Sequence, residues 1–548
     1  MINNRKKKNR EKLLKAFGAM KDESFNFEQI VKYFRKKNNS EAFQTLNDKT
    51  CNDLDFEELF MFVDRTSSKI GQQFLYNKLR TIPKQSNEIS RSEKIITVLS
   101  ENLDLRASIQ NQLSKLNNSD AFYISSLFQE EHIKAPKWFF VFRLLSFTSM
   151  LSLSMLFFNH NMIYILTGVF IVNLVVHYFN KNNIYQYIDS LPQLLRLNSV
   201  AQYLYKNDLF KEINPNLPSS FNILNKIRNR MSLFRMEAKL QGDLSEIFWG
   251  LFELFKIFFL LEPLFLFGIL KQLDTKRKEV EEIFLFVGEI DSLISIASLR
   301  KGLDKYCIPK IIQDQKVVMA NEAYHPLIID CVKNSIHVDR KSILLTGSNM
   351  SGKTSFIRTI AINAVTGLTL NTCFAGEFSM PRMRIFSAIR ISDDLLNDKS
   401  YYFEEVLTIK EMIDNSMDGK PNLFLLDEIF KGTNTVERIS AGKAVLSFLT
   451  KAENIVFVST HDIELADLLK DEYKLYHFSE KLDNKTVAFD YKLKEGKLKN
   501  RNAIRILEIN NYPEDIISEA IEIARELDKI NVANIKLSLG FDTTLTSN

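Results

Sequence analysis

The chain has 548 residues, a formal net charge of +5 and four cysteines. This length is enough for more than one hydrophobic core, so we expect several domains. The charge is too mild to indicate a nucleic-acid partner by itself. The cysteines have no paired spacing, which argues against a disulfide framework or a zinc site and fits a reducing cytosol. They are Cys51, Cys307, Cys331 and Cys373.

Residues 1–44 form a basic N-terminal region that opens without an apolar stretch and therefore does not resemble a signal peptide. Its positive charges gather in the first 15 residues. Such a run could contact anionic lipid or a phosphate backbone, or it could be a solvated tail. The residues of this run are Arg5, Lys6, Lys7, Lys8, Arg10, Lys12 and Lys15.

Residues 45–135 place apolar side chains at helical spacing between charged ones, as in the segment 56–63. This pattern predicts a bundle of amphipathic helices. Residues 182–310 return to charged, helical periodicity. We expect this second part to contain long helices that lead into the next domain, here called lever helices.

Residues 136–181 contain two nearly continuous apolar runs, 138–158 and 162–179, split by the polar turn 159–161. Each run is close to the roughly 20 residues that a bilayer-spanning helix needs. Lysines flank the pair on both sides and the turn has none, so the positive-inside rule puts both flanks in the cytoplasm. The pattern predicts a transmembrane hairpin; the alternative is a buried helical hairpin in a soluble core.

Residues 248–270 form a third apolar segment within the lever region. It contains Glu253, Lys256, Glu262 and Pro263, which are costly at the centre of a bilayer. A spanning helix here would also put the two ends of the chain on opposite sides of a membrane. An interfacial or re-entrant helix, or a short span, therefore competes with a buried lever helix.

From residue 311 to about 500, strands alternate with helices, which predicts an α/β domain. The apolar strand 342–345 runs into a loop that matches GxxxxGK[ST], and a helical segment follows. Backbone N–H groups of such a loop bind phosphates at a helix N-terminus, the lysine pairs with the β- and γ-phosphates, and the Thr354 hydroxyl coordinates Mg²⁺. The predicted phosphate-binding residues are Gly347, Ser348, Asn349, Met350, Ser351, Gly352, Lys353, Thr354 and Ser355.

Two further apolar strands end in residues that suit ATP hydrolysis. Strand 423–426 is followed by Asp427, expected to hold Mg²⁺, and by Glu428, expected to activate water as the general base. Strand 454–459 leads to His461, at the edge of the sheet where α/β proteins bind ligands, so we expect it to contact the γ-phosphate. Taken alone, a solvated strand end and a structural histidine are the alternatives.

A small hydrogen-bonding loop directly follows the predicted general base. Its composition suits the completion of a phosphate site in a second subunit, and the alternative is an ordinary turn. The predicted loop residues are Gly432, Thr433, Asn434 and Thr435.

These motifs resemble those of the MutS family, the ATPase branch known from DNA mismatch repair. The family's TGPNMSGKST loop is similar to residues 346–355, with Ser348 in place of proline. Its LLDE and ATH motifs are similar to residues 425–428 and 459–461, and Asn434 stands where its GTST loop usually has serine. The resemblance implies an ABC-like P-loop ATPase domain that binds ATP and Mg²⁺ and dimerises around nucleotide.

Flanking segments resemble the family more weakly. Residues 45–118 are similar to its core domain, and residues 491–520 to its C-terminal dimerisation segment, which predicts a helical dimerisation region over 501–548. Within the ATPase domain the matches include His325, Asn334, the segment 393–395, Ser400 and Glu405.

Other features depart from the family. Its mismatch-recognition domain has no counterpart before the core, and apolar segments stand where its DNA clamp is inserted between the lever helices. The position that stacks on adenine in the family falls near Cys331 or Val332, neither of which is aromatic.

The sequence therefore predicts a helical core and lever, with a transmembrane hairpin, followed by a P-loop α/β domain. We expect a membrane-anchored, MutS-like ATPase in which ATP turnover by a homodimer moves the lever helices against a membrane element or an unidentified protein partner. This places the chain in the cytoplasmic membrane, with the ATPase domain facing the cytoplasm. The alternative is a DNA-binding mismatch-repair or recombination ATPase, which requires a basic, salt-sensitive surface. A transporter is disfavoured, because two short spans make a poor substrate pathway.

Overall fold

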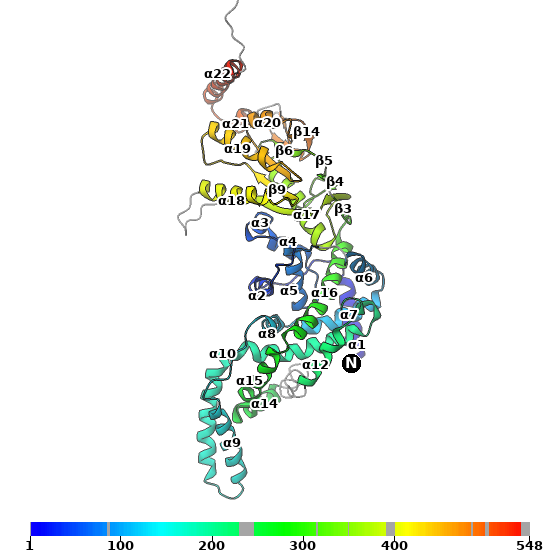
Figure 1. Ribbon diagram of the computed structural model, residues 1–548, viewed down its shortest axis with the longest axis vertical. Coiled ribbons are helices and arrows are strands. Elements are labelled where there is room, and N and C mark those ends of the chain that lie inside the picture. The colour runs from blue at the N-terminus through cyan, green and yellow to red at the C-terminus, as the bar shows by residue number, and fades with distance from the viewer. Residues whose placement is uncertain are drawn as a thin grey trace, which may run out of the picture. The chain divides into compact units, whose positions relative to one another are not determined.

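The computed structural model describes residues 2–84, 88–228, 246–313, 316–348, 350–390, 401–483, 486–498 and 503–538. The chain divides into two compact units. The helical unit comprises residues 1–46, 55–306 and 368–372, and the α/β unit comprises residues 47–54, 307–367 and 373–548. The predicted mixture of a helical part and an α/β part is therefore confirmed (Figure 1).

Amphipathic helices make up most of the helical unit, and their apolar faces form its core. Two pairs of residues add a short antiparallel ladder, β1 (Gln44–Thr45) with β2 (Thr81–Ile82). The α-helices are α1 (Ile2–Ala16), α2 (Phe27–Lys36), α4 (Phe56–Val63), α5 (Lys69–Arg80), α6 (Ile89–Glu101), α7 (Leu103–Leu113), α8 (Ser126–Gln129), α9 (Phe140–Met155), α10 (Met162–Tyr205), α11 (Asp208–Lys211), α12 (Leu217–Arg228), α14 (Glu246–Phe258), α15 (Leu261–Asp274) and α16 (Arg277–Gly302), with 3₁₀ turns η1 (Ser114–Leu116) and η2 (Ser119–Ile124).

A buried carboxylate joins two of these helices. Asp291 on α16 accepts hydrogen bonds at 2.8 Å from the backbone N–H groups of Ser67 and Ser68, and at 2.5 Å from the Ser68 hydroxyl. Gly71, in the first turn of α5, lies so close that a Cβ there would be 2.1 Å from Asp291 Oδ2. Burial raises the pKa of Asp291 to about 6, although these hydrogen bonds favour the charged form.

Helices α9 and α10 form the hairpin that the apolar runs predict, but α9 has only 16 residues. A helix of that length is ~24 Å long, shorter than the ~30 Å hydrocarbon core of a bilayer. Among the helices of the described residues, none combines the length and the apolar character that crossing a bilayer requires. This finding contradicts the predicted transmembrane hairpin and the predicted location in the cytoplasmic membrane.

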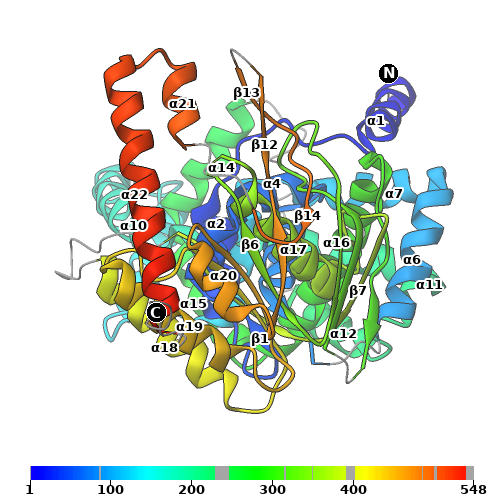
Figure 2. The ribbon, with the colours of Figure 1, turned by 90° about the horizontal axis from the view of Figure 1, so that it is seen from above.

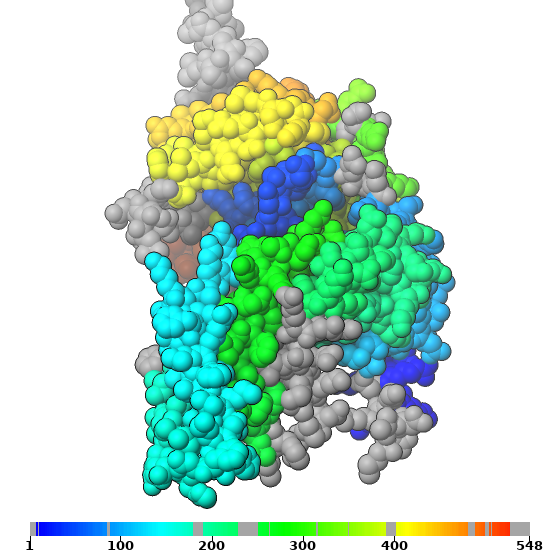
Figure 3. Space-filling model, turned by 60° about the horizontal axis from the view of Figure 1, so that its bottom comes forward, coloured from blue at the N-terminus to red at the C-terminus, as the bar shows by residue number. Residues whose placement is uncertain are grey.

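The hairpin is not buried in a core either. Many of its large apolar side chains are exposed, and those of Phe157 and Phe158 at its tip are 89% and 91% exposed. Figure 3 shows the described part of the hairpin as the cyan column of the space-filling view. Asn173 of α10 is buried against α9, where its side-chain amide donates a hydrogen bond to Ser149 Oγ at 3.2 Å.

The apolar segment 248–270 is not the single helix expected from its sequence. Helix α14 ends at Phe258 and α15 begins at Leu261, because Leu260 adopts a left-handed conformation with φ of 49°. Pro263 then lies in the first turn of α15, where its missing N–H leaves no helical hydrogen bond unmade. Leu260 and Phe267 pack on Phe142 of the hairpin.

The α/β unit is built on a six-stranded sheet with the order β14-β11-β6-β10-β9-β8. All neighbouring strands run parallel except β14, which pairs antiparallel with β11. Helices cover both faces, so the central strands are continuously apolar. The strands are β6 (Ser342–Thr346), β8 (Arg384–Ala388), β9 (Asn422–Asp427), β10 (Ile455–Thr460), β11 (Tyr473–His477) and β14 (Lys494–Glu495).

Helix α17 (Lys353–Leu370) lies on one side of β6, and α19 (Thr435–Leu449) and α20 (Ile463–Leu469) lie on the other (Figure 2). The second side is closed by a core that includes Phe424, Val458 and Leu446. The register places Ser459 opposite Asp427 and Thr460 opposite Thr346. The carboxyl ends of β6, β9 and β10 therefore meet at one edge of the sheet.

A four-stranded sheet, with the order β3-β7-β4-β5, stands beside the larger one in this unit. Its strands are β3 (Lys310–Ile312), β4 (Val317–Ala323), β5 (Asn334–Asp339) and β7 (Glu377–Pro381). The remaining elements are α3 (Asp48–Asp53), α18 (Tyr401–Ser416), the hairpin of β12 (Glu480–Asp483) and β13 (Thr486–Phe489), α21 (Ala503–Ile509) and α22 (Glu514–Ser538).

Candidate nucleotide-binding site

Two glycines shape the loop between β6 and α17, at positions where a side chain would strain the backbone or clash with a neighbour. Gly352 has φ of 105°, in the region that favours glycine. A Cβ on Gly347 would lie 2.8 Å from Ser351 Oγ and 2.9 Å from the carbonyl oxygen of Phe478. The chain can therefore turn tightly here and present the N-terminus of α17, an 18-residue helix whose dipole favours anions.

Polar side chains of this loop converge on the same place. Lys353 is buried, and its ammonium donates to the carbonyl oxygens of Gly347 and Ser348 at 2.8 and 2.9 Å. Burial lowers the pKa of Lys353, although the nearby Glu428 and Asp427 favour its charged form. Ser351 Oγ is buried without a hydrogen-bond partner. A buried cation and an unsatisfied hydroxyl at a helix N-terminus fit a bound phosphate group.

Two side chains with oxygen atoms that suit a metal ligand lie side by side next to the loop. The Thr354 hydroxyl donates a hydrogen bond to Asp427 Oδ2 at 2.6 Å, and Asp427 also accepts from the hydroxyl of Ser459 on β10. A hydroxyl and a carboxylate are hard oxygen ligands of the kind that Mg²⁺ prefers. The pair therefore fits Mg²⁺ held between a phosphate and the end of β9.

Glu428 follows β9 in a strained turn, with φ of 53° at Glu428 and 59° at Phe430. Its carboxylate forms ion pairs with His461 Nε2 and with the ammonium of Lys431. Burial by itself would raise the pKa of Glu428, but the hydrogen bonds and charges of His461 and Lys431 outweigh it and lower the pKa to about 2. The carboxylate is thus ionised at neutral pH and held by the ammonium of Lys431 and the imidazole of His461.

The residues after His461 are anchored to α19. Arg438 donates to both carboxylate oxygens of Asp462, at 2.8 and 2.9 Å. Asp462 precedes α20, and its backbone N–H donates to Thr460 Oγ1 at 3.0 Å. His461 is therefore fixed between β10 and α20 with its imidazole directed at Glu428.

In the loop 432–435, Gly432, Asn434 and Thr435 are exposed. Asn434, the residue that departs from the family's serine, is the N-cap of α19 and accepts a hydrogen bond from the backbone N–H of Glu437 at 3.0 Å. The substitution keeps a capping side chain, because asparagine and serine are both favoured at this position.

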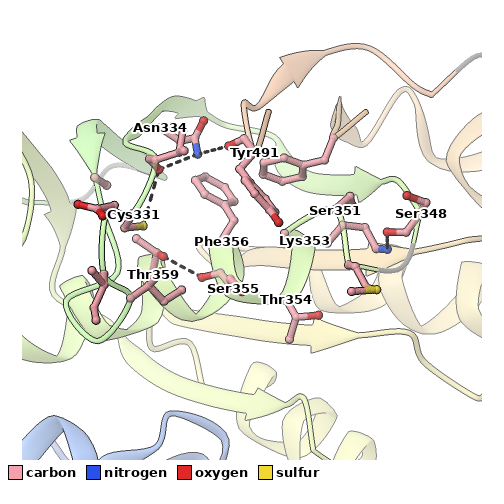
Figure 4. A pocket seen from close by; sticks show the side chains of 18 of the residues that line it. Cys331, Asn334, Ser348, Ser351, Lys353, Thr354, Ser355, Phe356, Thr359 and Tyr491 are labelled. Carbon is pink, nitrogen blue, oxygen red and sulfur yellow. Dashed lines mark hydrogen bonds between the residues drawn. The ribbon is translucent and has the colours of Figure 1, made fainter. Parts of the chain in front are cut away.

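A cavity of about 530 Å³ adjoins the phosphate loop. Ile328, Cys331 and Val332 line one part of it, and the rings of Phe356 and Tyr491 line another. Figure 4 shows Phe356 and Tyr491 between Cys331 on one side and Lys353 on the other. The Tyr491 ring lies against the phosphate loop, because a Cβ on Gly352 would be 3.3 Å from it. The volume lies in the range typical of small-molecule sites, and its wall combines polar groups of the loop with apolar and aromatic side chains.

Asn334 holds the segment that carries Tyr491. Its side-chain amide donates to the carbonyl oxygen of Tyr491 at 2.9 Å and accepts from the backbone N–H of Leu493 at 2.9 Å. Asn334 and Tyr491 resemble the family in separate segments, and the sequence alone does not join them. The two residues are more than 150 positions apart in the chain, so no local pattern connects them. The signal that could have identified Tyr491 is an aromatic residue directly after a strand.

The structure brings together most of the predicted site residues. Met350, Ser348, Ser355 and Glu428 line the cavity with the residues described above, whereas His461 and Asp427 contact residues that line it. The loop 432–435 is not among the lining residues. Asn349, Ser400 and the segment 393–395 lie outside the described residues.

Part of the chain is similar to a known protein family. Residues 343–528 match the family model of MutS domain V. The DNA mismatch repair protein MutS of Aquifex pyrophilus is 28% identical over 270 residues, which are 47% of this chain and 31% of that protein. The MutS of Methanosarcina acetivorans is 28% identical over 280 residues, which are 48% of this chain and 30% of its own length. These matches support the MutS family.

A yeast relative extends the comparison. The DNA mismatch repair protein MSH3 of Saccharomyces cerevisiae is 26% identical over 286 residues, which are 49% of this chain and 28% of that protein. The chain thus spans less than a third of the length of the curated relatives it matches.

Proposed function

We propose that this chain is a MutS-like ATPase that hydrolyses ATP with Mg²⁺ in the site between β6, β9 and β10. The observation that carries the proposal is the convergence of Lys353, Ser351 and the Thr354–Asp427 pair at one end of a cavity that Glu428 also lines. Bound Mg²⁺ would be held by Thr354 and Asp427 and would neutralise charge on the phosphates.

Glu428 is proposed to accept a proton from the water that attacks the γ-phosphate. Its low pKa keeps it ionised, but its ion pairs with His461 and Lys431 occupy the carboxylate in this arrangement. A catalytic base must exchange at least one such partner for water. We therefore propose that this arrangement is a resting one, and that nucleotide binding draws Lys431 or His461 toward the phosphates.

The part of the cavity that Phe356 and Tyr491 line is proposed to receive the nucleotide base. Tyr491 is the aromatic side chain best placed to stack on it, because its ring lines the cavity and its backbone is clamped by Asn334. This assigns the stacking role to a residue distant in sequence from Cys331 and Val332. Stacking on an aromatic ring tolerates different bases, since every base has a π-face.

We propose that two chains dimerise around nucleotide and that the loop 432–435 of each chain contacts the nucleotide bound by the other. The loop is exposed, precedes the 15-residue helix α19, and does not line the cavity of its own chain. These features suit a second subunit's phosphate site, where the N-terminus of α19 would face negative charge. Nucleotide-dependent association would then let the helical units of two chains move with each cycle.

The test is ATP hydrolysis by the purified full chain with and without Mg²⁺, alongside Lys353→Ala and, as a matched control, Lys420→Ala at an exposed turn. We expect turnover in the wild type and the control, and loss of nucleotide binding in Lys353→Ala. Sedimentation of the wild type with a non-hydrolysable ATP analogue should show a dimer. Equal turnover by Lys353→Ala and the control would refute the assigned site.

A second function is favoured by the names of the relatives, which are DNA mismatch repair proteins. We propose DNA binding in mismatch repair as the activity that the ATPase serves. Filter binding of homoduplex and mismatched DNA across a salt series measures this, because binding through phosphate contacts weakens steeply with salt. Retention of neither duplex at low salt would exclude this second function and leave ATP hydrolysis standing.

A further inference from the structure

A short helix from the N-terminal part of the sequence belongs to the α/β unit. The chain leaves the helical unit after Leu46, contributes residues 47–54 to the α/β unit, and returns at Asp55. Helix α3 (Asp48–Asp53) occupies most of this segment, and its N-cap Asn47 accepts a hydrogen bond from the backbone N–H of Thr50 at 2.8 Å. The excursion is therefore an ordered helix with its own cap.

Asp53, the last residue of α3, holds the end of strand β8. Its side chain is fully buried. One carboxylate oxygen accepts from the Ser387 hydroxyl at 2.6 Å and from the backbone N–H of Ile389 at 3.0 Å, and the other accepts from the N–H of Arg390 at 2.8 Å. The Arg390 guanidinium returns a hydrogen bond to the carbonyl oxygen of Asn52 at 3.1 Å.

The strand end that Asp53 holds is next to the strand that carries the catalytic carboxylates. In the parallel pair of β8 and β9, Ser387 lies opposite Leu425 and Ala388 opposite Leu426. The next residues of β9 and its turn are Asp427 and Glu428. A displacement of β8 at this point would therefore reach Glu428 through a single ladder of backbone hydrogen bonds.

A second contact leads from α3 to the other side of the same turn. The ammonium of Lys49 donates to the hydroxyl of Thr408 on α18. One helical turn earlier, the carboxylate of Glu405 is buried and accepts a hydrogen bond from the backbone N–H of Phe430. Phe430 is two residues after Glu428, in the same strained turn (Figure 1 shows α3 and α18).

The charges around Glu405 support this route. Burial raises the pKa of Glu405, and the Phe430 N–H together with the charges of Lys431 and Lys49 partly oppose the rise. Lys49 thus lies near enough to favour the ionised carboxylate that holds the turn. Helix α3 contacts both elements that flank Glu428, strand β8 through Asp53 and helix α18 through Lys49.

We propose that α3 couples the helical unit to ATP hydrolysis, with Asp53 and Lys49 as positioning residues for Glu428. Both ends of the segment 47–54 are covalently continuous with the helical unit, so a movement of that unit pulls on α3. The pull shifts β8 and α18, and with them the turn that orients the general base. This inference rests on the proposed ATP hydrolysis by the same site.

The test separates positioning from binding. In the full chain, Asp53→Asn replaces one acceptor oxygen by an N–H donor with little change in volume, and Lys49→Met removes the charge from a half-buried side chain. We expect kcat for ATP to fall about tenfold in Asp53→Asn and about threefold in Lys49→Met, because small displacements of reacting groups are costly. The Kd for a fluorescent ATP analogue should stay within twofold of wild type.

Matched controls use exposed residues of the same unit, Asp471→Asn and Lys410→Met. Both should keep wild-type kcat and Kd. Lys49→Met tests the proposal independently if Asp53→Asn melts at a lower temperature. Wild-type kcat in both variants, with unchanged melting temperatures, would overturn the coupling while leaving the ATPase assignment intact. A rise in the Kd for the ATP analogue as large as the fall in kcat would also overturn the coupling. Absence of hydrolysis by the wild type would instead refute the proposed function on which it rests.

Discussion

Two buried aspartates, one in each unit, accept hydrogen bonds from the same kinds of donor group. Asp291 and Asp53 each accept from one serine hydroxyl and two backbone N–H groups. The bonds of Asp291 join α5 to α16, whereas those of Asp53 hold the end of β8, next to the strand that precedes the proposed base Glu428. The two sets of hydrogen bonds are alike, but the backbone segments that they hold differ. A contact that holds two packed helices together stabilises the fold, whereas a contact that holds a strand beside the proposed base positions that base. Damage at the first site should change stability, and damage in the α/β unit should change turnover.

The largest effect is expected from Glu428→Gln, which removes the proposed base without touching either aspartate. Hydrolysis should fall by about 10³-fold, within the range that general bases contribute, while ATP binding persists. Single-turnover kinetics and sedimentation should show a dimer trapped with ATP. Glu411→Gln, at an exposed position on α18, is the control. Turnover of Glu428→Gln at the wild-type rate would assign the base to another residue.

In the helical unit, Gly71→Ala should cost about 4 kcal/mol of unfolding free energy, because its Cβ would overlap Asp291 Oδ2 and break the contact with α5. Urea denaturation measures the loss. Gly250→Ala, where a Cβ meets nothing within 4 Å, should instead be neutral or stabilising. The comparison predicts that the ATP turnover per folded molecule of Gly71→Ala stays at the wild-type value; a specific fall in kcat would break it.

The pH dependence of stability should also identify Asp291. Its pKa of about 6 exceeds the ordinary value of 3.8, so the folded state binds this proton more tightly than the unfolded state. Its contribution is fully present below pH 3.8 and is lost as the pH rises through 6, by about 3 kcal/mol at most. The stability of the wild type relative to Asp291→Asn should therefore decline over this window. A flat difference would show that the positive charge of Lys21, which favours the ionised carboxylate, offsets the effects of burial and of the Asp64 carboxylate.

The smallest of the four effects is expected at Tyr491. Replacement by alanine should raise the KM for ATP about tenfold with kcat nearly unchanged, since stacking on a base contributes about 1–3 kcal/mol. Steady-state kinetics measures the two constants separately. Tyr491→Phe keeps the ring and should behave as wild type. A fall in kcat without a change in KM would place Tyr491 with the positioning residues of the α/β unit.

The parts that could be predicted from sequence are those where chemistry demands a residue type at a strand end. Lys353, Thr354, Asp427, Glu428 and His461 sit where a phosphate loop and parallel strands put them. Asp53 could not be found in this way, because its segment has the helical pattern of its neighbours and its partners lie more than 330 residues away.

The apolar segments show the opposite limit. Composition alone does not reveal that α9 stops after 16 residues, or that Leu260 takes a left-handed conformation and divides the segment 248–270 into two helices. Both depend on local backbone geometry that apolar side chains do not specify.

The hydrogen bonds of Asn334 to residues 491 and 493 join two segments of the site that lie far apart in the sequence. The residues proposed to bind phosphate lie within a few positions of Lys353, whereas Tyr491, the residue proposed to stack on the base, follows about 140 residues later. A fragment that ends before Tyr491 would keep the first and lose the second. The strength of base stacking is therefore free to diverge between homologues by changes at position 491, without any alteration of the loop proposed to hold the phosphates.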